Sequence, residues 1–70
     1  MTLGEKIKLQ RKKHDMSQRD MAERLFVSRQ AVSKWEADKG IPDIENLRQI
    51  AALFNISLDY LINDEAKDDD

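Results

Sequence analysis

The stretch SQRDMAERLFVSRQAVSKWE, residues 17–36, decides the fold of this chain. Ser17 and Ser28 each stand where a helical pattern begins, and each can accept a hydrogen bond from the unpaired amides of a first turn. The apolar residues that follow have helical spacing: Met21, Ala22 and Leu25, then Ala31, Val32 and Trp35. Because only the short link 25–27 separates the two expected helices, they must cross sharply, and the stretch predicts a helix-turn-helix.

The flanking sequence predicts three more helices. An opening helix is expected over about residues 2–13, with Leu3 and Ile7 on its inner face. Two further helical patterns follow the capping residues Asp43 and Ser57. The main breaker is the segment 40–42, Gly-Ile-Pro, because glycine can take positive φ and proline cannot continue a helix. No strand-like alternation competes, so the expected fold is all-α, a compact bundle of five short helices.

Length and composition limit the chain to a single small domain. Seventy residues with 40% apolar and 37% charged side chains can form one modest core, which is too small for most enzyme architectures. There is no cysteine for a disulfide or a thiolate metal site. The longest apolar run, 50–54, is far shorter than the roughly 18 residues of a membrane span. Residues 1–10 contain no signal-like apolar segment, and a cytoplasmic location is expected.

Charge is distributed unevenly along the chain. The formal net charge is only −2, but residues 1–40 carry +4 and residues 41–70 carry −6. Such a chain can present a basic end to a polyanion. The last segment, 64–70, has no apolar side chain beyond Ala66. We therefore expect a domain at 1–63 followed by an acidic flexible tail at 64–70.

The third expected helix, about Ser28 to Glu36, has one polar face. At about 100° per residue, the side chains opposite the apolar face are Arg29, Gln30, Ser33 and Lys34. Arginine and lysine donate to guanine, glutamine pairs with adenine, and serine can serve either. The amides and positive dipole at the Ser28 end suit a phosphate. Any small helical bundle also has polar outer faces, so spacing alone leaves DNA reading and a merely solvated face both open.

Further motifs resemble a known family. They are Ser17 to Ala22, Val27 to Glu36, Gly40 to Pro42 and Phe54 to Leu61. In this order they resemble the Cro-like (XRE) helix-turn-helix family of phage-repressor DNA-binding domains, over about residues 3–63. The resemblance implies a lambda-repressor-like fold, with the helix-turn-helix formed by the second and third helices.

The resemblance also implies roles for individual residues. The base contacts in the major groove are expected at Arg29, Gln30, Ser33 and Lys34. The phosphate contacts are expected at Ser17, Gln18, Ser28 and Lys39. Arg11 and Glu36 match a basic and an acidic position that form an architectural pair in several family members. Trp35 is expected to pack in the core.

Two residues depart from the family pattern. Phe26 occupies the tight-turn position that glycine usually holds, where positive φ is strained for a bulky residue. We expect its ring to recover that cost by packing on a neighbouring helix. Gln10 stands where an apolar residue is common, which predicts a first helix that is rotated or weakly anchored.

These observations favour a sequence-specific DNA-binding transcriptional regulator, more specifically a repressor that occludes a promoter. A homodimer is expected because a single domain makes few base contacts. The resemblance implies that the contact runs through the fourth and fifth helices, with Leu58 and Ile62 among the residues expected there. The alternatives are a protein-interaction module, such as an antitoxin-like partner, or the DNA-binding fragment of a larger regulator. His14 is the sole histidine and is expected at the surface. Without a catalytic constellation, we expect no enzyme activity, metal, cofactor, small-molecule substrate or membrane contact.

Overall fold

The computed structural model describes residues 1–63, which form five α-helices and no strand. The helices are α1 (Leu3–Lys13), α2 (Gln18–Leu25), α3 (Arg29–Glu36), α4 (Ile44–Phe54) and α5 (Leu58–Ile62). The predicted all-α fold is confirmed. No helix within 1–63 is long and apolar enough to cross a membrane. The expected tail at 64–70 lies outside the described residues.

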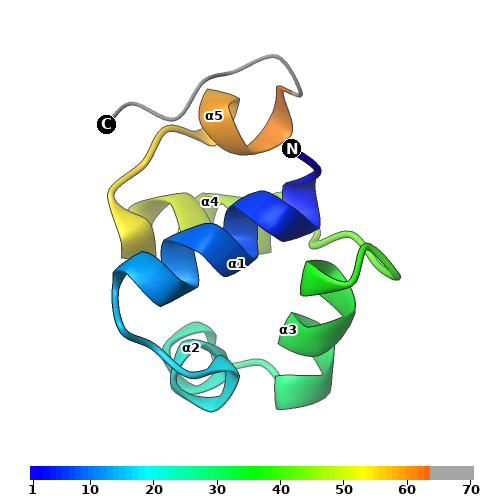
Figure 1. Ribbon diagram of the computed structural model, residues 1–70, viewed down its shortest axis with the longest axis vertical. Coiled ribbons are helices and arrows are strands. Elements are labelled where there is room, and N and C mark those ends of the chain that lie inside the picture. The colour runs from blue at the N-terminus through cyan, green and yellow to red at the C-terminus, as the bar shows by residue number, and fades with distance from the viewer. Residues whose placement is uncertain (64–70) are drawn as a thin grey trace.

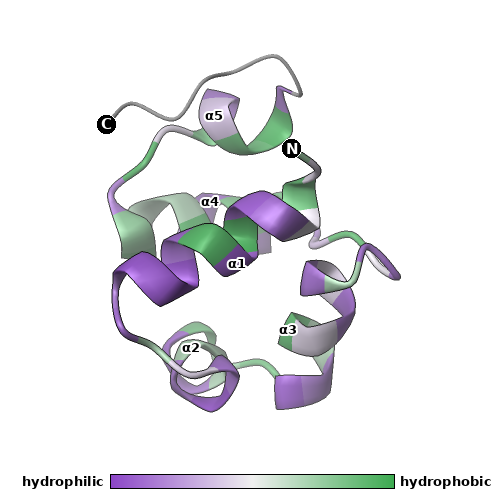
Figure 2. Cartoon of the chain, in the orientation of Figure 1, coloured by the Kyte–Doolittle hydropathy of each residue, from purple (hydrophilic) through white to green (hydrophobic). Residues whose placement is uncertain are grey.

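Helix α1 is the centre of the bundle. It crosses the middle of the molecule in Figure 1 and contacts α3, α4 and α5. Helix α2 packs against α3 and α4, so the helix-turn-helix unit is held against the rest of the bundle from two sides. Figure 2 shows hydrophobic stretches on α1 and α4 in the interior and hydrophilic first turns on α2 and α3 at the periphery.

Every helix begins at a capping side chain. The caps at Ser17, Ser28, Asp43 and Ser57 are formed as predicted, and Thr2 caps α1 in the same way. In each case the side-chain oxygen accepts a hydrogen bond from the amide three residues later. The start of each helix is therefore fixed by local chemistry.

Four helices end at a residue with left-handed backbone, and none of these residues is glycine. They are Asp15, Phe26, Asp38 and Asn55, with φ between 54° and 57°. At each end the next amide bonds back to the carbonyl five residues earlier, as in Lys39 N to Lys34 O at 2.9 Å. Gly40, in the segment expected to break the helical pattern, does not have positive φ, and the left-handed residue after α3 is Asp38. Asp38 adopts this conformation because a short polar side chain tolerates this region.

The core takes residues from all five helices. Ile7, Met21, Val32, Ile50 and Leu61 are almost completely buried. Trp35 is also in this core, as predicted, so it belongs to packing and not to the outer face of α3.

Helix α1 is not weakly anchored, which corrects the expectation based on Gln10. Gln10 is itself buried, with 3% of its surface exposed, one turn after the buried Ile7. Lys6 adds a second anchor: it is 1% exposed, and its Nζ donates to Tyr60 O at 2.8 Å and Asn63 O at 2.6 Å. Lys6 therefore helps to hold this helix in place, because the carbonyls that its ammonium group bonds lie at the end of α5.

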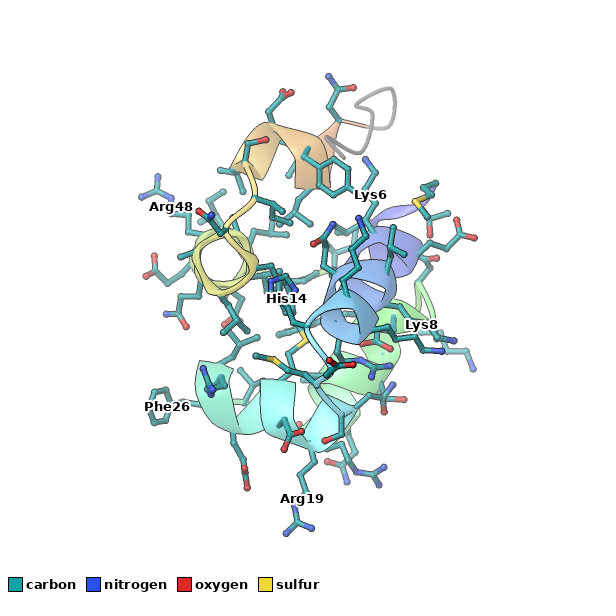
Figure 3. All side chains as sticks on the ribbon, turned by 60° about the vertical axis from the view of Figure 1, so that its left-hand side comes forward. Lys6, Lys8, His14, Arg19, Phe26 and Arg48 are labelled. Carbon is teal, nitrogen blue, oxygen red and sulfur yellow. The ribbon has the colours of Figure 1, made fainter. Side chains whose placement is uncertain are left out.

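Phe26 has the predicted left-handed backbone, with φ 57° and ψ 41°, but its ring does not pack on a neighbouring helix. The residue is 94% exposed, and Figure 3 shows the ring pointing away from the bundle. The expected compensation is wrong because the turn points outward between α2 and α3, where no third helix covers it.

Candidate nucleic-acid interface

The outer face of α3 is built as its periodicity predicts. Arg29, Gln30, Ser33 and Lys34 are all exposed, whereas Val32 and Trp35 of the same helix are buried. Burial of the inner face fixes the rotation of α3 about its axis. The four predicted base-contacting side chains therefore share one solvent-facing surface, and their contacts with bases remain a prediction.

A buried ion pair holds α3 against α1. The Arg11 guanidinium donates to Glu36 through Nε at 2.6 Å and Nη2 at 3.0 Å, and these side chains are 10% and 4% exposed. Arg11 Nη1 also donates to Met16 O at 2.8 Å. The hydrogen bond to Glu36 raises the pKa of Arg11, and burial opposes this rise. The predicted architectural pairing of Arg11 with Glu36 is therefore present in the structure.

Gln18 extends this pair to α2. Its Nε2 donates to Glu36 Oε1 at 3.1 Å, and the residue is only half-buried. One carboxylate thus links α1, α2 and α3. Gln18 is held by Glu36 while part of the residue stays in solvent, and its contact with a phosphate remains a prediction.

A shallow hollow lies where the first turns of α2 and α3 approach each other. It is lined by Arg11, Ser17, Gln18, Arg19 and Arg29. Three arginines and the amides of a capped helix start suit an anionic oxygen. We did not single out Arg19 from the sequence, although an arginine directly after Gln18 in a first turn is the signal that could have identified it. Figure 3 shows Arg19 extending from the molecule beside α2.

The predicted serine phosphate contacts are also exposed. Ser17 and Ser28 accept amide hydrogens from Asp20 and Ala31. The hydroxyl proton of Ser28 remains able to donate to a phosphate oxygen, whereas the Ser17 hydroxyl also bonds the Asp20 carboxylate. The amide and the carboxylate of Asp20 complete a capping box with Ser17. Hydrogen bonds from the Ser17 backbone and hydroxyl lower the pKa of Asp20.

The loop after α3 brings the remaining predicted residue, Lys39, to the surface. The preceding Asp38 is tied to α1: its carboxylate accepts hydrogen bonds from Thr2 Oγ1 at 2.7 Å and Gly4 N at 2.9 Å. These contacts could not be predicted from local sequence patterns, because they join residues 34 and 36 positions apart.

The charges around this face are mainly positive. Two carboxylates near the ends of this face, Glu36 and Asp38, are engaged in hydrogen bonds with other elements, and in α2 Glu23 lies 3.9 Å from Arg19 while Asp20 bonds Ser17. The arginine and lysine side chains of the α3 face, Arg29 and Lys34, are exposed to solvent. This arrangement can attract a polyanion and can offer hydrogen-bond donors to it.

The expected dimer surface lies on another part of the molecule. Leu58 is half-buried, and Ile62 is 55% exposed at the end of α5. These side chains leave apolar surface available to a second copy. Dimer formation itself remains a prediction.

The comparisons with known proteins agree with this geometry. The family described as helix-turn-helix matches residues 7–61. The HTH-type transcriptional activator BcrR of Enterococcus faecalis is 40% identical over 65 residues, covering 93% of this chain and 32% of that protein. Repressor protein C2 of Salmonella phage P22 is 35% identical over 60 residues, covering 86% of this chain and 28% of the phage protein. This chain thus spans only part of the length of these relatives.

The fold is also similar to a solved complex. The crystal structure of the P22 c2 repressor with a synthetic operator has a TM-score of 0.86 and 33% identity, over 90% of this chain and 96% of that one. A solution structure of the DNA-binding domain of the same repressor has a TM-score of 0.85 and 31% identity, over 96% of this chain and 88% of that one.

Proposed function

This chain belongs to the helix-turn-helix family, of the Cro-like (XRE) type, and on that premise we propose that it is a sequence-specific DNA-binding regulator of transcription. The observation that carries the proposal is the α3 surface, where Arg29, Gln30, Ser33 and Lys34 are exposed together on a helix whose opposite face is locked in the core. A fixed helix with this donor set fits the major groove of duplex DNA.

The proposed contacts form two groups, one to the bases and one to the phosphate backbone. Arg29, Gln30, Ser33 and Lys34 read base edges, which gives sequence preference. Ser17, Gln18, Ser28 and Lys39 hold the phosphate backbone, which fixes the register of α3 without reading sequence. Arg19 joins the phosphate group, because it lines the same hollow as Ser17 and Gln18.

The protein acts as a homodimer in this proposal. One copy presents few base contacts, and each mismatch costs only about 1–3 kcal/mol. Two copies related by a two-fold axis would address half-sites about 34 Å apart. The exposed apolar surface at Leu58 and Ile62 supports a contact through α4 and α5.

The regulator works in the cytoplasm as a repressor that occludes a promoter. The relation to the P22 repressor supports this direction. A relative named as an activator shows that the opposite direction occurs among similar proteins. Measuring transcription from a promoter carrying the selected site, with and without the protein, decides between them.

Selection of bound sites from random DNA duplexes is the direct test. Enrichment of one two-fold symmetric sequence is expected, with log Kd depending linearly on log salt by about 0.9 per neutralised phosphate. Arg29→Ala should relax the preference at one base pair, whereas Lys39→Ala should weaken all sequences about equally. No enrichment, or two variants that cannot be distinguished across the site library, would contradict the assigned roles. A shallow salt dependence with a protein partner would favour an interaction module instead.

A further inference from the structure

The C-terminal end of α3 docks on the N-terminal end of α1 with no space between the two backbones. A Cβ added to Gly4 would lie 2.4 Å from Trp35 O and 2.7 Å from Glu36 O. These carbonyls belong to the last turn of α3, where the helix dipole places partial negative charge. The first turn of α1 carries partial positive charge, so the two helix ends attract each other.

Asp38 completes this junction from the α3 side. Thr2 caps the amide of Glu5 within α1, while the Asp38 carboxylate accepts the amide of Gly4 at 2.9 Å and the Thr2 hydroxyl at 2.7 Å. The start of α1 is therefore capped twice, once from its own sequence and once from the loop after α3. An ionised carboxylate makes both of the latter hydrogen bonds stronger than neutral ones.

The backbone of Asp38 adds a second restraint. Its φ is 57°, its amide bonds to Trp35 O at 3.2 Å, and the amide of Lys39 bonds to Lys34 O at 2.9 Å. The chain leaves α3 in one defined direction because these bonds close the last turn. Lys39 is thus attached to a position that both the backbone and the side chain of Asp38 hold in place.

We infer that Asp38 is a positioning residue for DNA binding: by tying the end of α3 to Thr2 and Gly4, it presents Lys39 to a backbone phosphate. This inference rests on the proposed function. It predicts a direction for the change in DNA affinity that is opposite to the one expected from charge alone. A carboxylate beside a DNA-binding surface repels phosphates, so its simple removal should tighten binding. If Asp38 positions Lys39, its removal weakens binding instead.

Asp38→Gly is the decisive variant, because glycine accepts the left-handed backbone and removes only the carboxylate bonds. The matched control is Asp15→Gly, which removes one negative charge at the same kind of helix end, φ 54°, away from Lys39. Both variants and the parent are titrated with the selected duplex at several salt concentrations. Circular dichroism first establishes a temperature at which all three are fully folded.

For Asp38→Gly we expect the affinity for DNA to fall about tenfold, which is the effect of one lost charge-assisted contact. The slope of log Kd against log salt should decrease by the amount that corresponds to about one phosphate contact. Asp15→Gly should bind as tightly as the parent or more tightly. Lys39→Ala should match Asp38→Gly, and the double variant should be no weaker than either, because both changes remove the same contact. Asp38→Asn keeps a side-chain oxygen that can accept the hydrogen bond from Gly4 N, so it should lose less DNA affinity than Asp38→Gly.

Equal or tighter binding by Asp38→Gly, or an additive loss in the double variant, would overturn the inference. A loss of affinity with an unchanged salt dependence would do the same, since it would indicate general loosening of the domain. These results leave DNA binding by the parent intact and so differ from failure of the proposed function. If the parent forms no complex at low salt, the proposed function fails and this inference fails with it.

Discussion

Replacing Phe26 with glycine should stabilise the domain. Phe26 has φ 57° and ψ 41°, a region that costs an L-residue with a side chain roughly 1–2 kcal/mol. The residue is 94% exposed, so removing its ring sacrifices almost no buried surface. Glycine relieves the backbone strain and loses part of that gain through the greater freedom of the unfolded chain, about 0.5–1 kcal/mol. The expected net gain in unfolding free energy is about 0.5–1 kcal/mol.

The measurement is equilibrium unfolding in urea, followed by the fluorescence of Trp35, which is the sole tryptophan and is buried. For a domain of this size, 1 kcal/mol corresponds to a rise in Tm of about 4–8 °C. Phe26→Ala is the control, because alanine removes the ring but keeps the Cβ that causes the strain. It should change stability by no more than about 0.5 kcal/mol.

Two results would refute this reasoning about Phe26. Equal stabilisation by alanine and glycine would mean that the exposed ring, and not the backbone, is the source of the cost. Destabilisation by glycine would mean that the ring makes stabilising contacts in the folded protein.

Two further predictions concern charged groups. Arg11→Ala should lower the unfolding free energy by about 3–5 kcal/mol in urea titrations, because it leaves the buried Glu36 carboxylate without its cation. Replacing both Arg11 and Glu36 with methionine should recover most of this loss. A double variant as unstable as Arg11→Ala would count against this explanation. The hydrogen bonds from Ser17 lower the pKa of Asp20 below its ordinary value of 3.8, so the stability that the carboxylate contributes is present above that pH and is lost as the pH falls through the lowered value. The unfolding free energy of Asp20→Asn should therefore decrease less on acidification below about pH 4 than that of the parent, and parallel pH profiles would contradict the assignment.

Local features of this fold could be predicted from the sequence because their causes are local. The serine and aspartate caps each act on an amide three residues away, so Ser17 and Ser28 already locate the starts of α2 and α3. The outer face of α3 follows from periodicity, because the burial of Val32 and Trp35 determines where Arg29 and its neighbours point. The left-handed backbone of Phe26 was predicted from the family resemblance, in which glycine usually holds this turn position.

Features that depend on the packing of distant segments could not be predicted. The Asp38 contacts with Thr2 and Gly4 require the relative placement of α1 and α3, which no local pattern contains. The same reason explains the error about Gln10, whose burial depends on the elements around α1. The burial of Lys6 could not be predicted either, because the carbonyls that accept its hydrogen bonds lie more than 50 positions away in the sequence.

The position of Lys6 has a consequence for the synthesis of the protein. Its ammonium group reaches carbonyls 54 and 57 residues further along, so the first helix and the last are joined by one side chain. While the ribosome is still adding α5, the Lys6 ammonium group has no carbonyls to replace its hydrating water. Burial of this charge without partners is costly, so the core around Lys6 is not expected to form at that stage. We therefore expect the domain to mature after Asn63 has left the exit tunnel, and a nascent chain that stalls before α5 to remain open to proteases.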